Sequence, residues 1–166
     1  MLLGASIAAT GCGPSAVPAP YVVPVVETAN LPPYIADFDD ACLSGFPDER
    51  RLEDELAAKG WDRSDDGEPF WTRRQHASNT HAVALSLSQE DGVTRCTMAV
   101  PAFSWTTLVG EVDALLMQRW GEVAERDAEA GSVVWLSARR DGAQIVTLTS
   151  LGPGAARAFL AAQWGS

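Results

Sequence analysis

The chain has few basic residues, and this shortage excludes one broad class of function. Among its 166 residues, 12 are Lys or Arg and 22 are Asp or Glu, which gives a formal net charge of −10. Proteins that bind nucleic acid gain affinity by placing Lys and Arg against phosphates, so we expect no nucleic-acid partner. If there is a protein partner, an acidic surface favours a basic one.

Long apolar runs and known catalytic motifs are also missing. A membrane-spanning helix needs about 20 apolar residues, whereas the N-terminal apolar run stops near residue 12. The sequence contains no GxSxG, HExxH, P-loop or Rossmann fingerprint, no CxxC pair and only 2 histidines. We therefore expect a non-enzymatic protein without a cofactor, and a periplasmic hydrolase or metal-binding enzyme is the alternative.

The N-terminus combines an apolar segment with a cleavage pattern of small residues. Leu2, Leu3 and Ile7 precede the tetrapeptide ATGC, which ends at Cys12. This segment resembles the lipobox of bacterial lipoproteins. The resemblance implies that residues 1–11 are a signal peptide, shortened if the true start codon lies upstream, and that Cys12 becomes a lipidated amino terminus. An ordinary cleaved signal or an apolar terminus without a role is the alternative.

Residues 12–36 are predicted to be a Pro-rich tether. Proline cannot continue a helix, and such segments favour extended, semi-rigid conformations. The tether would hold a single domain, residues 37–166, clear of the membrane surface. The expected location is the cell envelope, with a lipid anchor in the membrane and the domain facing the periplasm, or secretion. The prolines that support this prediction are Pro14, Pro18, Pro20, Pro24, Pro32 and Pro33.

An even pair of cysteines remains if Cys12 carries a lipid. Disulfides persist in oxidising compartments, so Cys42 and Cys96 are predicted to pair. Closing a loop of that length stabilises a fold by about 4 kcal/mol in the chain-entropy model. Free thiols or a catalytic cysteine are the alternatives, and no Cys/His spacing indicates a zinc site.

The domain shows the same order of helix and strand signals twice. Residues 38–59 are predicted to be helical in two pieces, and a hairpin with strands at 83–88 and 96–100 follows around Asp91-Gly92. A second helix begins at Ser104 or Thr106 and ends at Gly121. The second hairpin turns at Asp141-Gly142, and the similar segments LSQEDG and LSARRDG suggest an internal repeat. Its strands, and a last predicted helix, cover residues 133–138, 144–151 and 153–164.

A tandem αββ repeat predicts an α+β fold. The sheet would be four-stranded and antiparallel, with the helices on one face and a C-terminal helix added. The other face would carry small and hydroxyl residues around an aromatic ring and is a candidate binding surface, although a solvated face without a role is the alternative. The candidate contact residues are Trp135, Ser86, Thr97 and Thr149.

Three groups of residues offer weaker chemical hypotheses. Asp62, Ser64 and Asp66 match alternate ligand positions of a calcium loop, but Arg73 occupies the position of the essential Glu. His76 and His81 are five apart, which places them on different faces of a helix or strand. The acids of residues 37–55 could include a carboxylate pair for hydrolysis, or they could line a solvated helix. A cleft that joins a histidine to two acids would favour an enzyme, and an exposed apolar sheet face would favour a binding protein.

The segment Phe38-Asp39-Asp40-Ala41-Cys42-Leu43, together with Gly60-Trp61 and Cys96, is similar to a pattern in small exported α-proteobacterial proteins of undefined function. The resemblance implies a similar fold and a disulfide, and it implies no activity. We expect an envelope lipoprotein that makes contacts with a protein or ligand. A specific version is a periplasmic inhibitor or adaptor of a basic partner protein.

Overall fold

The computed structural model describes residues 31–64, 67, 69–73, 81–102, 104–121, 125–129, 131–137, 142–152 and 154–165, with residues 125 and 126 described by their backbone alone. Helices and strands are both present, as expected for an α+β fold. In chain order the elements are α1 (Pro33–Phe38), the π-helix η2 (Asp39–Leu43), α2 (Glu49–Ala58), β1 (Trp61–Ser64), β2 (Phe70–Arg73), β3 (Ala84–Glu90), β4 (Val93–Pro101), α3 (Trp105–Trp120), β5 (Glu125–Glu129), β6 (Ser132–Leu136), β7 (Ile145–Ser150) and β8 (Arg157–Trp164).

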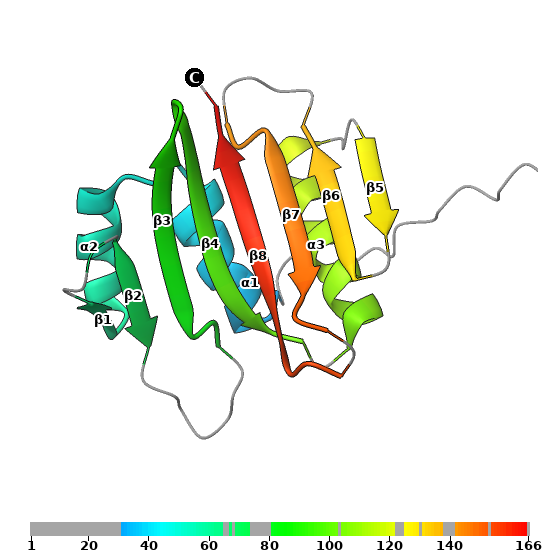
Figure 1. Ribbon diagram of the computed structural model, residues 1–166, viewed down its shortest axis with the longest axis horizontal. Coiled ribbons are helices and arrows are strands. Elements are labelled where there is room, and N and C mark those ends of the chain that lie inside the picture. Colours follow the sequence, from blue (N-terminus) through cyan, green and yellow to red (C-terminus); the bar gives the residue numbers. More distant parts are fainter. Residues whose placement is uncertain are drawn as a thin grey trace, which may run out of the picture.

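All the strands belong to one antiparallel sheet (Figure 1). The sheet has eight strands in the order β1-β2-β3-β4-β8-β7-β6-β5. Each half of the chain supplies a helical segment followed by four strands, and the halves meet where β4 pairs with β8. The helices lie behind the sheet in the view of Figure 1, so they cover one of its two faces.

The predicted four-stranded sheet and αββ unit are wrong. The strands β1, β2 and β5 read WDRS, FWTR and ERDAE, and such short, polar segments lack the alternating apolar pattern that signals a strand. The repeated order is a helical segment followed by four strands. By position, the hairpin β3–β4 therefore corresponds to β7–β8 and not to β6–β7, so the turns at LSQEDG and LSARRDG are not equivalent.

The predicted C-terminal helix is also wrong, because β8 occupies its place. The segment RAFLAAQW is rich in good helix formers. However, β8 is hydrogen-bonded to β4 on one side and β7 on the other, and Leu160, Ala162 and Trp164 alternate into the core with at most 9% exposure. Two complete ladders and this burial outweigh the helix propensity of the segment.

The first helical segment begins earlier than predicted. Pro33 is the first residue of α1, so residues 33–36 belong to a helix and not to the tether. Proline is well suited to this position because the N–H that it lacks would have no partner within the helix. The chain then continues into η2, where the side chain of Arg51 donates to the carbonyl of Ala41 at 2.7 Å, and the indole of Trp164 donates to that of Cys42 at 2.9 Å. These two bonds fix the π-helix to α2 and β8.

The two longer helices are confirmed, with clear start and stop signals. Asp48 accepts a hydrogen bond from the backbone N–H of Arg51 at the start of α2, and Ser104 caps α3 in the same way. Gly60 and Gly121 follow the helices with a φ of 75° each, a left-handed conformation that glycine adopts without steric cost.

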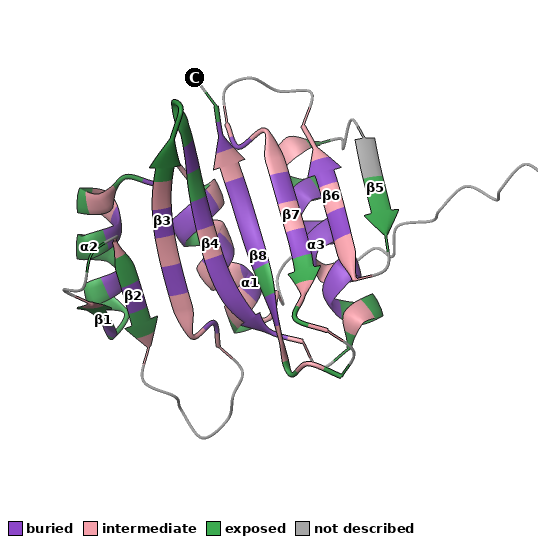
Figure 2. Ribbon diagram, viewed as in Figure 1, coloured by how far each residue is buried: buried purple, intermediate pink, exposed green. Residues whose placement is uncertain are grey.

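The predicted disulfide is present, and it links η2 to the sheet. Cys42 and Cys96 are bonded, with their Cα atoms 5.6 Å apart, and both are fully buried. Trp135 contradicts its predicted place on the open face: it points to the core side of β6, is 0% exposed and donates a hydrogen bond to Asp113 of α3. Figure 2 shows the resulting alternation of buried and partly exposed positions along the central strands.

Candidate functional site

The sheet face opposite the helices is the candidate site, and three of the four predicted contact residues lie on it. Ser86 of β3 is paired with Thr97 of β4, and Thr149 of β7 is paired with Phe159 of β8. Side chains of paired residues point to the same face of a sheet. Trp135 is the exception, as described above. We call this surface the open face.

Two rows of neighbouring residues cross the open face at right angles to the strands. Within each row, every residue is paired with the next one on the adjacent strand, so the side chains are in contact distance. All of these residues are small, hydroxyl-bearing or apolar, and none is charged. The first row is Phe70, Ser86, Thr97, Ala161, Thr147 and Val134, and the second is Thr72, Ala84, Ala99, Phe159, Thr149 and Ser132.

Two phenylalanines stand out on this surface. Phe159 is 41% exposed and Phe70 is 37% exposed. The neighbours of Phe159 within its row are Ala99 and Thr149, so small side chains leave its ring accessible. The sequence predicts neither ring as a contact residue, because Phe159 falls in the predicted C-terminal helix and Phe70 falls outside every predicted strand. The alternation of FLAAQW in β8 is the signal that could have identified Phe159.

Acidic residues lie at the boundaries of the open face. The rows continue to Asp62 on β1 and to Asp127 and Glu129 on β5, which are the two edge strands. Two arginines, Arg95 of β4 and Arg157 of β8, lie near opposite ends of the central pair of strands. The central positions of the two rows are therefore uncharged, and the acids lie on the two edge strands.

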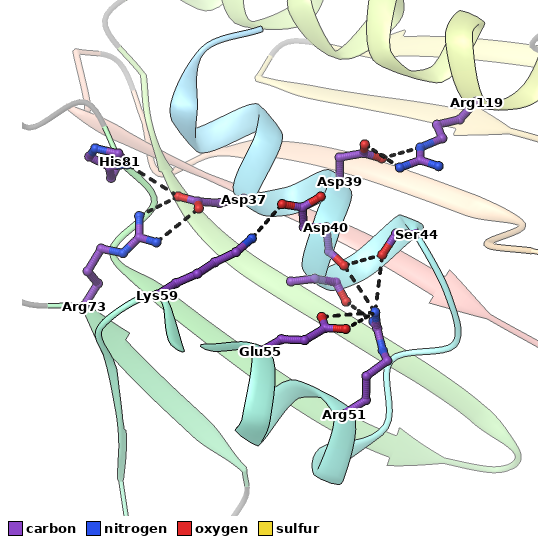
Figure 3. A network of polar contacts seen from close by, with 11 residues as sticks. Asp37, Asp39, Asp40, Ser44, Arg51, Glu55, Lys59, Arg73, His81 and Arg119 are labelled. Carbon is purple, nitrogen blue, oxygen red and sulfur yellow. Dashed lines mark hydrogen bonds and ion pairs between the residues drawn. The ribbon is translucent and has the colours of Figure 1, made fainter. Parts of the chain in front are cut away.

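Behind the sheet, the acids at the start of the domain form ion pairs (Figure 3). Asp37 of α1 receives two hydrogen bonds from Arg73 of β2, at 2.7 and 3.1 Å. The two side chains are 11% and 9% exposed, and the guanidinium carbon of Arg73 lies 4.7 Å from the ring centre of Trp61. This buried pair fixes α1 to the sheet, and both oxygens of the Asp37 carboxylate are used.

The neighbouring acids are paired in the same way. Asp39 accepts two hydrogen bonds from Arg119, both at 2.5 Å. Asp40 is bonded to Lys59 at 2.6 Å. On α2, Glu55 pairs with Arg51, and Glu49 and Glu53 pair with Arg63. These are structural ion pairs, and they account for most of the acids in which the sequence suggested a hydrolytic carboxylate pair.

The weaker metal and histidine hypotheses gain no support from the described residues. His81 lies beside one acid, with its Nδ1 atom 3.7 Å from Asp37 Oδ2, and His76 is outside the described residues. Asp62 and Ser64 belong to the strand β1 and not to a loop, while Asp66 is outside the described part. Across the described ranges, no group of three or more His, Cys, Asp or Glu residues is placed to hold a metal ion.

The signal peptide, residues 1–11, and the lipidation site Cys12 also lie outside the described residues. Among the helices that the structure describes, none is both long and apolar enough to cross a membrane. No family model, curated protein or solved structure matches the chain.

Proposed function

We propose that this chain is an exported, lipid-anchored binding protein that contacts a basic protein partner through the open face. The observation that carries the proposal is the uncharged surface around Phe159, with acids on both lateral edges. Interface centres are depleted in charge and rich in aromatic rings, while charged rims steer the partner. The partner is thus a protein with an apolar contact centre and Lys or Arg residues around it.

Two features support a location outside the cytoplasm. The Cys42–Cys96 disulfide is buried, and such bonds are typical of oxidising compartments. In addition, the first described helix begins 21 residues after Cys12, at Pro33. A Pro-rich segment of that length, at about 3 Å per residue when extended, could separate the domain from a membrane by roughly 60 Å.

The ion pairs also support a non-enzymatic role. Asp37 and Asp39 each accept two hydrogen bonds from an arginine, which holds a carboxylate in one geometry. A general acid or base must be able to exchange a proton with a substrate. We therefore assign these acids to the stability of the helical layer.

Photo-crosslinking in the native cells tests the contact face. A photoreactive residue is placed at Thr97 or Ser86 on the open face, and at Ala57 on α2 as the control, since Ala57 is exposed and lies on a different element. We expect adducts with one protein, through peptides rich in Lys or Arg, from the open-face positions only. Adducts that are absent from the open face, or equally strong from Ala57, would contradict the proposal.

The variant Phe159→Ala tests whether this ring supplies much of the binding energy of the contact. Removing an aromatic hot-spot side chain costs about 2 kcal/mol or more of binding energy, which is roughly a thirty-fold loss of affinity. Phe159→Ala should abolish the adduct from Thr97 while the protein keeps its thermal stability, because the Phe159 ring is 41% exposed.

Lipidation is tested separately by mass spectrometry of the N-terminal peptide. Cys12 should carry acyl chains, and the peptide of the variant Cys12→Ala should carry none.

A further inference from the structure

A pocket of about 380 Å³ lies at one end of the molecule, on the helix side of the sheet. Its walls come from the end of η2 and the segment after it, the end of α3, the residues before β7 and the end of β8. The volume falls in the lower part of the range that is typical of small-molecule sites, about 300 to 1,000 Å³. The lining residues that matter for its chemistry are Leu43, Phe46, Arg119, Trp120, Gly142 and Trp164.

Three aromatic residues line the pocket. Phe46 is 51% exposed and packs edge-to-face on Trp164, with ring centres 5.9 Å apart. Trp164 is held in place by the hydrogen bond from its indole to the carbonyl of Cys42, and Cys42 is itself fixed by the disulfide. Trp120 completes the group from the last turn of α3. The rings form a preformed wall that suits a flat apolar group.

Among the described residues that line the pocket, Arg119 alone carries a charge. Its Nε and Nη2 atoms both donate to Asp39, which is not among the lining residues (Figure 3). The hydrogen bond to Asp39 raises the pKa of Arg119, so the group stays charged. Asp39 occupies one edge of the guanidinium and thereby orients it. The Nη1 amino group lies outside this pair of bonds.

We propose that the pocket binds a small carboxylate that carries an aromatic ring. The ring would stack among Phe46, Trp120 and Trp164, and the carboxylate would accept hydrogen bonds from Arg119 Nη1. Arg119 places a cationic donor at the described pocket wall, paired with Asp39 on one edge, although the chain as a whole is acidic. An arginine that is oriented by a carboxylate on one edge is preorganised for such a ligand. This site is independent of the contact proposed for the open face.

The test uses 3-phenylpropanoate as the probe, with 3-phenylpropanamide and 3-phenylpropylamine as its neutral and cationic counterparts. Binding to the full chain is followed by NMR, through the indole N–H signals of Trp120 and Trp164. We expect saturable shifts of these two signals with the carboxylate, and affinity at least about ten-fold weaker for both counterparts, since a charge-assisted hydrogen bond is lost.

Three variants locate the site. Arg119→Gln should remove the preference for the carboxylate. Gly142→Leu should block binding by filling the pocket, and the fold should accept it because a Cβ at Gly142 meets nothing within 4 Å. Arg95→Gln, on the open face, is the matched control and should bind like the parent protein. Non-reducing electrophoresis and thermal melting confirm that each variant is folded.

The proposal is overturned if 3-phenylpropanoate gives no saturable shift in the parent protein. It is equally overturned if the amide binds as well as the acid, or if Arg119→Gln and Gly142→Leu leave the affinity unchanged. If a partner crosslinks to the open face but 3-phenylpropanoate does not bind, the pocket proposal fails while the proposed function stands.

Discussion

Breaking the Asp37–Arg73 pair should destabilise the fold far more than breaking the Lys59–Asp40 pair, although their shortest contacts are nearly equal in length. The shortest N–O distances are 2.7 Å for the first pair and 2.6 Å for the second. Arg73 makes a second hydrogen bond to Asp37, and the two pairs differ strongly in burial. The side chains of Asp37 and Arg73 are 11% and 9% exposed, and those of Lys59 and Asp40 are 38% and 54% exposed.

The expected magnitudes follow from this difference. Arg73→Met leaves the Asp37 carboxylate buried without its bidentate partner, and such a change costs about 3–5 kcal/mol of unfolding free energy. Lys59→Met removes a solvent-screened pair and should cost at most about 1 kcal/mol. Replacing both buried partners, as in Asp37→Leu with Arg73→Met, removes the uncompensated charge and should recover most of the loss.

Urea unfolding with the disulfide intact measures these values as a double-mutant cycle. We expect a coupling energy of about 2 kcal/mol or more between Asp37 and Arg73, and less than about 1 kcal/mol between Asp40 and Lys59. Equal coupling in the two pairs would refute the argument that burial decides the strength. So would additive effects of Asp37→Leu and Arg73→Met, because they would mean that neither side chain senses the loss of the other.

Three further predictions concern a cross-link, a helix end and a titration. Replacing both Cys42 and Cys96 by Ala opens a loop with a sequence separation of 54 and should lower the unfolding free energy by about 4 kcal/mol. Urea titration measures this loss, and a value below about 1 kcal/mol would contradict the chain-entropy model of disulfide stabilisation. Gly121→Ala should lower it by about 1 kcal/mol, because the φ of 75° disfavours a Cβ, whereas Gly121→Asn should cost less. Burial, followed by a hydrogen bond to a carboxylate, raises the pKa of Tyr34. The protonated Tyr34 therefore contributes its full stabilisation below the ordinary tyrosine pKa of about 10, and this contribution is lost as the pH rises through the higher pKa of the folded state. In a Tyr21→Phe variant, Tyr34 is the one remaining tyrosine, and absorbance at 295 nm should show no ionisation of the native protein near pH 10. A normal titration there would refute the shift.

Local sequence signals were sufficient for several elements. Ser104 and Gly121 mark both ends of α3, since a cap and a left-handed glycine act within one turn of the chain. Asp91-Gly92 marks the turn between β3 and β4, where both residues have positive φ values of 50° and 78°. These features depend on neighbours in sequence, and so they could be predicted without knowledge of the fold.

The candidate site could be predicted only in part. The position of Ser86 and Thr97 on the open face is predictable because they alternate with core residues within one recognisable hairpin. The prediction for Trp135 is wrong, although the sequence predicts its strand. Its neighbours on β6 are apolar as well, in the sequence SVVWL, and alternation cannot choose a face when both faces carry apolar residues. Its contact with Asp113, 22 residues away, decided the choice.

The sequence by itself determined the acidic charge, the two main helices and the central hairpin, because composition and short-range patterns carry that information. Only the tertiary structure decided that β8 is a strand at the centre of an eight-stranded sheet. Its helix-favouring residues are held extended by ladders to β4 and β7 and by burial of alternate side chains. The same long-range pairing created the open face and brought Phe46, Arg119 and Trp164 together around one pocket. Contacts between residues far apart in the chain depend on the assembled fold, and no local pattern encodes them.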